Sequence, residues 1–209
     1  MADSDKKIPN KMYIFCEGTK TEPLYLEAFV EDRVSQKSKI IKIPPTRKNT
    51  PVQLVDEAIA KKNSKETTDG DVFWVVYDRE SVAKYSKKLH CEAYAKAKKN
   101  NINIALSNVC FEFWVLLHFE YTTAHYTCFD NLMAESKLKA FLKKAGIDKY
   151  DKGSDILYFK IKGGIENAKA RAVKVNSTVL ESSANKKLEP HEYSPYTNIH
   201  ELLNAIENF

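Results

Sequence analysis

The 209-residue sequence contains no long hydrophobic run. No apolar stretch approaches the roughly 20 residues that a membrane-spanning helix needs. The polar segment 1–11 also lacks the hydrophobic core of a signal peptide. These absences exclude membrane proteins and favour a cytoplasmic protein. We expect residues 1–11 to form a disordered tail, because they contain almost no apolar side chains that could pack.

Cysteine is scarce, and neither cysteine nor histidine occurs at metal-ligand spacing. The four cysteines, Cys16, Cys91, Cys110 and Cys128, include no Cys-x-x-Cys pair. This pattern predicts buried thiols in a reducing compartment and argues against zinc sites and disulfides. We expect the five histidines to have surface or core roles. No internal repeat or low-complexity tract is present, and the length fits one domain with an elaboration.

The net charge of +5 is unevenly distributed. Residues 135–190 contain 13 Lys/Arg and 7 Asp/Glu, whereas residues 1–134 contain 20 and 18. Two explanations remain open. The surplus of positive charge forms either a solvated helical surface or a surface that contacts a nucleic-acid backbone.

Short apolar runs alternate with segments of helical periodicity in the first half of the chain. We expect strands at residues 12–15, 40–43, 73–77 and 102–106. The helices between them are expected at residues 21–33, from residue 50 onwards, and at about 86–100, with Thr21 and Thr50 as N-caps. This alternation predicts an α/β fold with a parallel sheet of about four strands flanked by helices.

The second half is expected to be mainly helical. Predicted helices cover residues 110–119, 133–145, 165–180 and 198–208, and Gly146 ends the second of these. The apolar segment 110–119 is expected to be a buried helix. We therefore divide the chain into an α/β core at 12–120 and a mainly helical C-terminal part at 121–209 that packs on the core.

Acidic residues follow two of the expected strands. Glu17 comes directly after the first strand, with Glu22 in the next helix, and Asp78 and Glu80 follow the third strand. Because the carboxyl ends of parallel strands share one edge of a sheet, these acids would form an oxygen-rich pocket suited to Mg²⁺ or Mn²⁺. Alternation in an extended segment would point Asp78 and Glu80 the same way. Such acid pairs also occur in solvated loops.

Polar residues after the fourth strand can reach the same edge. Ser107 and Asn108 are expected to contact substrate, although Asn108 is equally suited to cap the following helix. Glu112 interrupts an apolar segment, where an unpaired carboxylate would be costly. It therefore pairs with a lysine, binds a metal ion through water, or orients a catalytic group.

These residues carry a resemblance to a known family. Glu17–Gly18 after the first strand, with Asp78 and Glu80 after the third, resembles the Toprim metal-binding module of topoisomerases, primases and some nucleases. The sequence is more closely similar to the RloB-like family of bacterial abortive-infection proteins. The segments that carry this closer resemblance are residues 17–25, 107–119, 150–153 and 195–200.

The resemblance implies a Toprim-type, divalent-metal-dependent nuclease that acts on RNA or DNA in anti-phage defence, often encoded beside an ABC-type ATPase partner. The expected ligands of Mg²⁺ or Mn²⁺ are Glu17, Glu22, Asp78 and Glu80. The expected catalytic residues are Glu17, Glu22, Glu112 and Lys152, and the expected substrate-binding residues are Lys20, Ser107 and Asn108. Lys152, from a family-like Tyr-x-Lys segment, would stabilise phosphate charge, unless it is an ordinary loop lysine.

Two departures from the family pattern affect detail rather than chemistry. The acid pair is Asp-x-Glu where Toprim domains more often have Asp-x-Asp, and Val109 stands where the family often has proline. A competing interpretation is a non-catalytic subunit that binds nucleic acid or an ATPase. A receiver-like domain with Asp78 as phosphoacceptor would leave the last third of the chain unexplained. The sequence leaves the choice of DNA or RNA and the oligomeric state open.

Overall fold

The computed structural model describes residues 9–185 and 188–209, so residues 1–8 of the expected tail lie outside the described residues. A five-stranded sheet has the order β2-β1-β3-β4-β5. The first four strands are parallel and β5 is antiparallel to β4. The strands are β1 (Met12–Cys16), β2 (Ile41–Lys42), β3 (Val72–Asp78), β4 (Asn103–Asn108) and β5 (Tyr196–Thr197). The predicted α/β class is confirmed.

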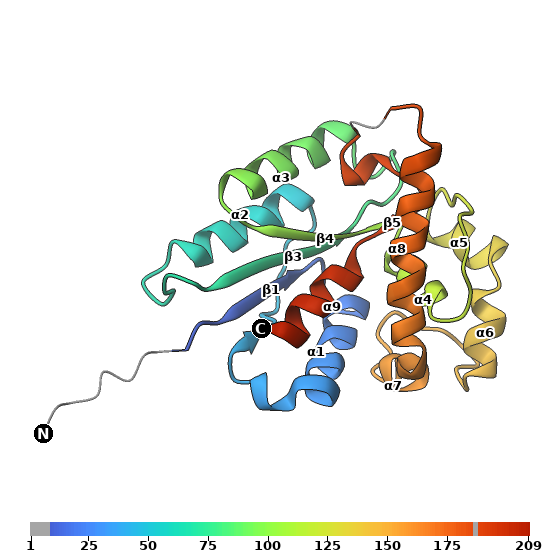
Figure 1. Cartoon of the computed structure of the whole chain (residues 1–209), viewed down its shortest axis with the longest axis horizontal. Coiled ribbons are helices and arrows are strands. Elements are labelled where there is room, and N and C mark those ends of the chain that lie inside the picture. Colours follow the sequence, from blue (N-terminus) through green and yellow to red (C-terminus); the bar gives the residue numbers. More distant parts are fainter. Residues whose placement is uncertain (1–8, 186–187) are drawn as a thin grey trace, which may run out of the picture.

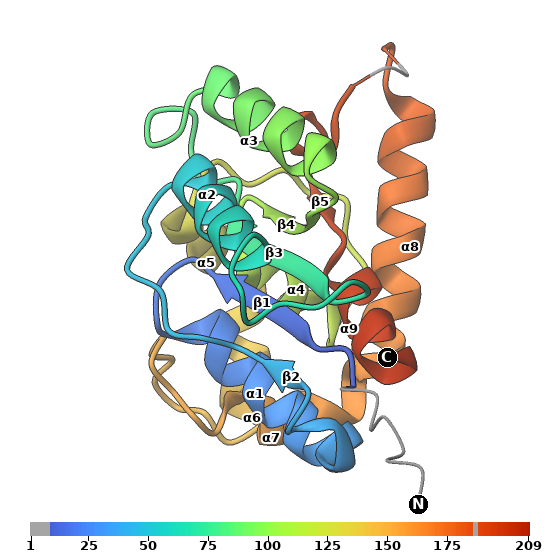
Figure 2. The same ribbon diagram turned by 90° about the vertical axis from the view of Figure 1, so that its left-hand side faces the viewer.

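Helices cover both faces of the sheet (Figures 1 and 2). One face is covered by α2 (Pro51–Lys62) and α3 (Lys87–Lys99), and the other by α1 (Thr21–Val34), α4 (Phe111–Leu117) and α9 (Ile199–Asn208). Side chains of β3 alternate between these two cores, because successive strand residues point to opposite faces. Trp74 and Val76 enter the α1 side, whereas Val75 and Tyr77 enter the α2 side.

The N-caps of the first two helices differ from each other. Thr50 caps α2, since its hydroxyl accepts a hydrogen bond from the backbone N–H of Gln53 at 3.3 Å, as predicted. The prediction for Thr21 is wrong. Lys20 occupies the N-cap position of α1 and Thr21 is the first helical residue. The hydroxyl of Thr21 donates instead to the backbone oxygen of Lys152, at 2.9 Å.

The C-terminal part contains more and shorter helices than the sequence predicts. The expected helix at 133–145 is two helices, because Ser136 adopts an extended backbone (ψ 167°) that interrupts the helical path. Gly146 ends the second of them with a φ of +86°, as predicted. The helices are α5 (Phe129–Glu135), α6 (Leu138–Lys144), α7 (Leu157–Ile161) and α8 (Ile165–Ser182). Short 3₁₀ segments are Ser35–Lys37, Lys162–Gly164 and Pro190–Glu192.

The segment before α9 supplies a strand that the sequence does not predict. Tyr196 and Thr197 pair with the last two residues of β4. The next residue, Asn198, extends this pairing with its side chain, which accepts from the N–H of Leu106 at 2.7 Å and donates to the oxygen of Ile104 at 2.9 Å. An amide side chain thus satisfies backbone groups at the edge of the sheet.

Exposure corrects one further expectation. Cys16 and Cys110 are buried as predicted, but Cys91 is exposed and Cys128 is half-buried.

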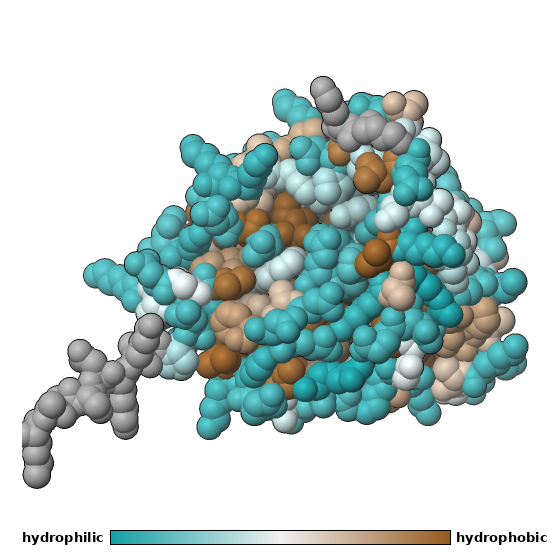
Figure 3. All heavy atoms as spheres, in the orientation of Figure 1, coloured by the Kyte–Doolittle hydropathy of each residue, from teal (hydrophilic) through white to brown (hydrophobic). Residues whose placement is uncertain are grey.

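The face that carries α8 and α9 is mostly hydrophilic, with hydrophobic residues in small separate patches (Figure 3). Within residues 9–185 and 188–209, no helix has the length and apolar content needed to cross a bilayer.

Candidate metal and phosphate site

Four carboxyl groups lie together at the carboxyl ends of β1 and β3. Asp78 is the last residue of β3 and Glu17 directly follows β1. Glu22 and Glu112 each occupy the second position of a helix, α1 and α4 respectively. Three of the four are strongly buried, with exposures of 9% for Glu22, 5% for Asp78 and 0% for Glu112. Glu17, Glu22 and Asp78 are three of the four acids expected at this edge, whereas the fourth member of the observed group is Glu112 and not Glu80.

Local backbone structure explains why these acids meet. Gly18 has a φ of +74°, which lets the chain turn sharply after β1 and begin α1 beside the sheet edge. On the other side, Asp78 is in register with Ser107, and the chain then leaves β4 and enters α4 within three residues. The N-termini of α1 and α4 thus both lie near Asp78. Helix N-termini favour negative charge, which lowers the cost of placing acids there.

The electrostatics of Glu22 and Asp78 are strongly perturbed. Burial raises the pKa of Glu22 from 4.5 to about 8, and the negative charges of Glu112 and Glu17 add to this effect. Burial likewise raises the pKa of Asp78, followed by the charges of Glu22, Glu112 and Glu17. The neighbouring acids thus disfavour the ionisation of both Glu22 and Asp78, as expected for acids that share one site. At neutral pH a bound cation would relieve this repulsion.

Glu112 has partners on one oxygen only. Tyr150 donates a hydrogen bond to Oε1 at 2.8 Å, and the ammonium of Lys152 lies 3.8 Å from the same oxygen. The second oxygen, Oε2, is buried without a hydrogen-bond partner among the described residues. A buried carboxylate oxygen without a partner is costly. Glu112 is thus partly paired with a lysine, as one of the three sequence-based alternatives proposed, but still has a free oxygen.

Lys152 lies beside this acid group. Burial lowers the pKa of its ammonium, but the charges of Glu112 and Asp78 outweigh burial, so the net pKa is raised. Its Nζ also lies 4.2 Å from the centre of the Phe129 ring, at cation–π distance. The bond from Thr21 to the backbone oxygen of Lys152 ties this loop to the start of α1.

Glu17 is fixed by contacts that the sequence does not indicate. The single hydroxyl proton of Tyr85 is shared between Glu17 Oε1, at 2.6 Å from the hydroxyl oxygen, and the backbone oxygen of Asn49. The N–H of Asp78 donates to Oε2 of Glu17 at 3.4 Å. Burial raises the pKa of Glu17, and the hydrogen bond from Tyr85 partly offsets that effect. No spacing in the sequence relates Tyr85 to Glu17, because the loop after β3 brings them together.

Glu80 departs from the predicted geometry. Its φ of +58° ends the extended segment, so the alternation that would point Asp78 and Glu80 the same way does not hold. Lys84 pairs with its carboxylate at 2.6 Å. Glu80 influences the pKa of Glu17 but is not among the charges that act on Asp78 or Glu22. It therefore lies at the margin of the acid group.

The three expected substrate contacts differ in accessibility. Lys20 is exposed at the start of α1. Ser107 is 1% exposed and its hydroxyl shares a 2.9 Å hydrogen bond with that of Thr197. Asn108 does not cap α4, whose N-cap is Cys110 without a side-chain bond. Its amide donates instead to the oxygen of Tyr193 at 2.7 Å, because the last residues of β4 pack against the segment before β5.

The donor chemistry suits Mg²⁺ or Mn²⁺, which prefer carboxylate oxygens. The unpartnered Oε2 of Glu112 and the raised pKa values of Glu22 and Asp78 also favour a cation. However, in the described part of the chain no three His, Cys, Asp or Glu side chains are already arranged to hold a metal ion. The acids are close enough to repel one another without forming a finished ligand set.

Comparisons with known proteins identify the family. No curated protein and no solved structure matches this chain. A family model described as RloB-like protein matches residues 12–206, nearly the whole sequence, including every residue of the acid group. The chain therefore belongs to the RloB-like protein family.

Proposed function

We propose that this protein is a divalent-metal-dependent nuclease that hydrolyses phosphodiester bonds in RNA or DNA. The observation that supports this most is the buried group of Glu22, Asp78 and Glu112 at the carboxyl ends of parallel strands. Burial, with the negative charges of Glu112 and Glu17 added to it, raises the pKa of Glu22 to about 8. A protein gains no stability from such a group on its own, and perturbed pKa values of this kind concentrate at functional sites.

We assign the metal-holding role to Glu22 and Asp78, with Glu17 and Glu80 at the margin of the same site. A bound divalent ion, or a pair of ions, would supply charge stabilisation for the attacking and leaving oxygens of a phosphodiester. Glu112 lies beside these metal-holding acids, and its Oε2 has no hydrogen-bond partner among the described residues. Tyr150 and Lys152 hold the other oxygen of Glu112 and so fix its direction.

The reaction also requires a proton transfer and a group that faces the negative charge of the phosphate. Hydrolysis forms a bond between the water oxygen and phosphorus, which releases a proton from the water, and breaks the bond to one ester oxygen, which takes up a proton. In the metal-free protein Glu22, with a pKa near 8, is largely protonated at neutral pH, so it would release its carboxyl proton when it binds a divalent ion. The side chain of Lys152 is 38% exposed, so its ammonium can face negative charge on the phosphate.

A cavity that shares Tyr150 with the acid group is suited to the nucleic-acid backbone. This cavity, of about 440 Å³ beside α6, is lined by Tyr150, which contacts Glu112, and by three lysines. These lysines are Lys139, Lys143 and Lys149. They belong to the basic segment 135–190, and phosphate contacts of this type give binding without base specificity.

The decisive experiment incubates the purified protein with total cellular RNA and with plasmid DNA, in Mn²⁺, in Mg²⁺ or in EDTA. We expect cleavage that requires the metal ion and is lost in Asp78→Asn. Glu31→Gln is the matched control, because Glu31 is an exposed acid on α1 outside the acid group. Metal-dependent cleavage that survives in Asp78→Asn would assign the activity to a contaminant or to another site.

A role in anti-phage defence, with an ABC-type ATPase as partner, is part of this proposal and comes from the family resemblance. The assay is therefore run with and without an ABC-type ATPase, taken from the genes that neighbour this one if they encode one. If the protein binds RNA or DNA tightly but never cleaves either, with or without the ATPase, the non-catalytic subunit replaces the nuclease as the favoured function.

A further inference from the structure

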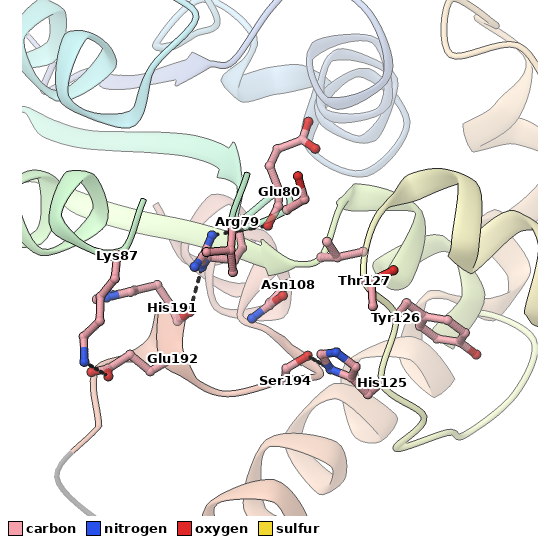
Figure 4. Close-up of a pocket in the computed structure, with 13 residues that line it drawn as sticks. Arg79, Glu80, Lys87, Asn108, His125, Tyr126, Thr127, His191, Glu192 and Ser194 are labelled. Atoms are coloured by element: carbon pink, nitrogen blue, oxygen red, sulfur yellow. Dashed lines mark hydrogen bonds and ion pairs between the residues drawn. The ribbon is translucent and has the colours of Figure 1, made fainter. Parts of the chain in front are cut away.

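A second cavity, of about 620 Å³, lies beside the ends of β3 and β4 (Figure 4). Segments distant in the sequence form its wall: the residues after β3, the start of α3, the residues after β4, the segment before α5 and the loop before β5. Its volume is within the range of small-molecule sites, about 300–1,000 Å³. None of the sequence-based expectations concerned this cavity, although Asn108 and Glu80 line it.

Arg79 is the notable charge in the wall. Arg79 is only 7% exposed, yet no carboxylate among the described residues forms an ion pair with its guanidinium. Its Nε donates to the oxygen of His191 at 3.1 Å, and its Nη1 donates to the oxygens of Tyr85 at 3.0 Å and Glu80 at 3.3 Å. Nη2 makes no hydrogen bond to a described residue. A buried cation held only by neutral carbonyls is suited to an anionic ligand.

The acids in the wall do not neutralise this cation, because each has its own lysine. Glu80 pairs with Lys84 at 2.6 Å, and Glu192 pairs with Lys87 at 2.5 Å. The rest of the wall combines apolar surface with a few polar groups. Val82, Val109 and Tyr126 supply the apolar surface, whereas Asn108, Ser194 and His125 supply the polar groups. A wall of this kind is suited to a nucleoside attached to a phosphate.

The position of Arg79 relates this cavity to the acid group. Arg79 directly follows Asp78, and its N–H still bonds to the oxygen of Ser107 at 2.8 Å, so the backbone remains paired. Successive residues in an extended segment project to opposite sides. Asp78 therefore faces the acids of α1 and α4, while Arg79 faces the side of α3, where its own backbone oxygen contacts His90 at 3.1 Å.

We propose that Arg79 binds the phosphate next to the one that is cleaved, and that the cavity holds the nucleoside attached to it. This inference rests on the proposed nuclease function and names the substrate unit: one nucleotide of a single strand that crosses the edge of the sheet. The strand would place one phosphate at the acids and the neighbouring phosphate at Arg79. A free nucleotide has the same chemistry, so the test separates the two sources.

The test measures binding without catalysis, in EDTA, so that its outcome does not depend on cleavage. Short fluorescent oligonucleotides of mixed sequence, one of RNA and one of DNA, are titrated at several salt concentrations. We expect Arg79→Gln to weaken binding and to reduce the slope of log affinity against log salt by about 0.7, the contribution of one single-strand phosphate contact. Arg33→Gln, at the far end of α1, is the matched control and should leave the slope unchanged.

Because Arg79 also holds three backbone oxygens, a second pair of variants tests the cavity without disturbing them. Thr127 is exposed on the wall. Thr127→Glu adds a negative charge there and Thr127→Gln adds similar volume without charge. We expect Thr127→Glu to weaken oligonucleotide binding at least fivefold relative to Thr127→Gln, on the order of 1 kcal/mol by the usual conversion. Equal affinities of these two variants, with an unchanged salt slope in Arg79→Gln, would overturn the proposal.

Competition separates a strand from a free nucleotide. The four nucleoside 5′-monophosphates are added as competitors, and we expect displacement of the oligonucleotide only at concentrations far above its own dissociation constant. If a mononucleotide displaces the oligonucleotide at an equal concentration, the ligand of the cavity is a free nucleotide and not a strand, and the proposal is overturned. If the wild-type protein cleaves nucleic acid but all cavity variants bind the oligonucleotides as tightly as the wild type, this inference is wrong and the proposed nuclease function stands. Arg79-dependent binding without any cleavage removes the nuclease function and leaves a nucleotide-binding cavity.

Discussion

Replacing Glu22 by glutamine tests whether the acid group is repulsive in the metal-free protein. Glu22 is 9% exposed, and burial together with the charges of Glu112 and Glu17 raises its pKa from 4.5 to about 8. The folded protein therefore keeps a proton on Glu22 over a pH range in which the unfolded chain has released it. Glutamine has nearly the same shape as a protonated glutamic acid but does not titrate.

The sign of the effect follows from this difference in proton binding. The folded state binds more protons than the unfolded state between pH 4.5 and about 8, so the free energy of unfolding falls as the pH rises through this window. The favourable term is complete below pH 4.5 and lost above pH 8. At about 1.4 kcal/mol for each pKa unit, the loss is on the order of 4 to 5 kcal/mol.

The assay is urea unfolding in EDTA across this pH window, for the wild type, Glu22→Gln and the control Glu31→Gln. We expect the wild type and the control to lose stability as the pH rises. Glu22→Gln should lose several kcal/mol less and become the most stable of the three at the alkaline end. Adding Mn²⁺ should stabilise the wild type, by about 2.7 kcal/mol at a concentration 100-fold above the dissociation constant, but not Glu22→Gln.

The result that would refute this reasoning is a parallel pH dependence in all three proteins. It would mean that Glu22 titrates alike in the folded and unfolded states, so that neither burial nor the neighbouring acids act on it. A destabilised Glu22→Gln protein at the alkaline end would be equally contrary, because it would require a favourable partner for the ionised carboxylate.

Three further predictions concern other parts of the structure. Glu112→Gln should abolish cleavage while calorimetry shows a melting temperature within a few degrees of wild type; loss of a buried ion pair worth roughly 3–5 kcal/mol would instead lower it by about 6 °C or more. Burial lowers the pKa of His118 from 6.5 to about 4, so the unfolded chain takes up a proton first as the pH falls through that window. Urea unfolding should show that the free energy of unfolding falls by on the order of 3 kcal/mol as the pH is lowered through this window. The fall should be smaller in His118→Gln. Changing Lys139, Lys143 and Lys149 to glutamine should weaken oligonucleotide binding and flatten its salt dependence in fluorescence titrations. The same change at Lys88, Lys98 and Lys99, exposed lysines of α3 outside both cavities, should not.

Local sequence determined the elements whose signals depend on near neighbours. The apolar run that ends at Asp78 predicted a buried strand, because parallel strands are covered on both faces. Thr50 and Gly146 marked a helix start and a helix end through side-chain capping and a positive φ. The order of these elements predicted the parallel α/β sheet, and with it the edge at which Glu17, Glu22 and Asp78 gather.

Tertiary structure decided what depends on contacts between distant segments. The two-residue strand β5 exists because Thr197 meets Ser107 at the sheet edge, 90 positions earlier. The partners of the acids, such as Tyr85 beside Glu17, come from loops whose paths no spacing encodes. Arg79 lies between Asp78 and Glu80 in the sequence, and the turn at Glu80 and the packing of the loop before β5 place its side chain in a cavity wall. Periodicity and capping are local properties of a chain, whereas burial and charge pairing arise only once distant segments pack together.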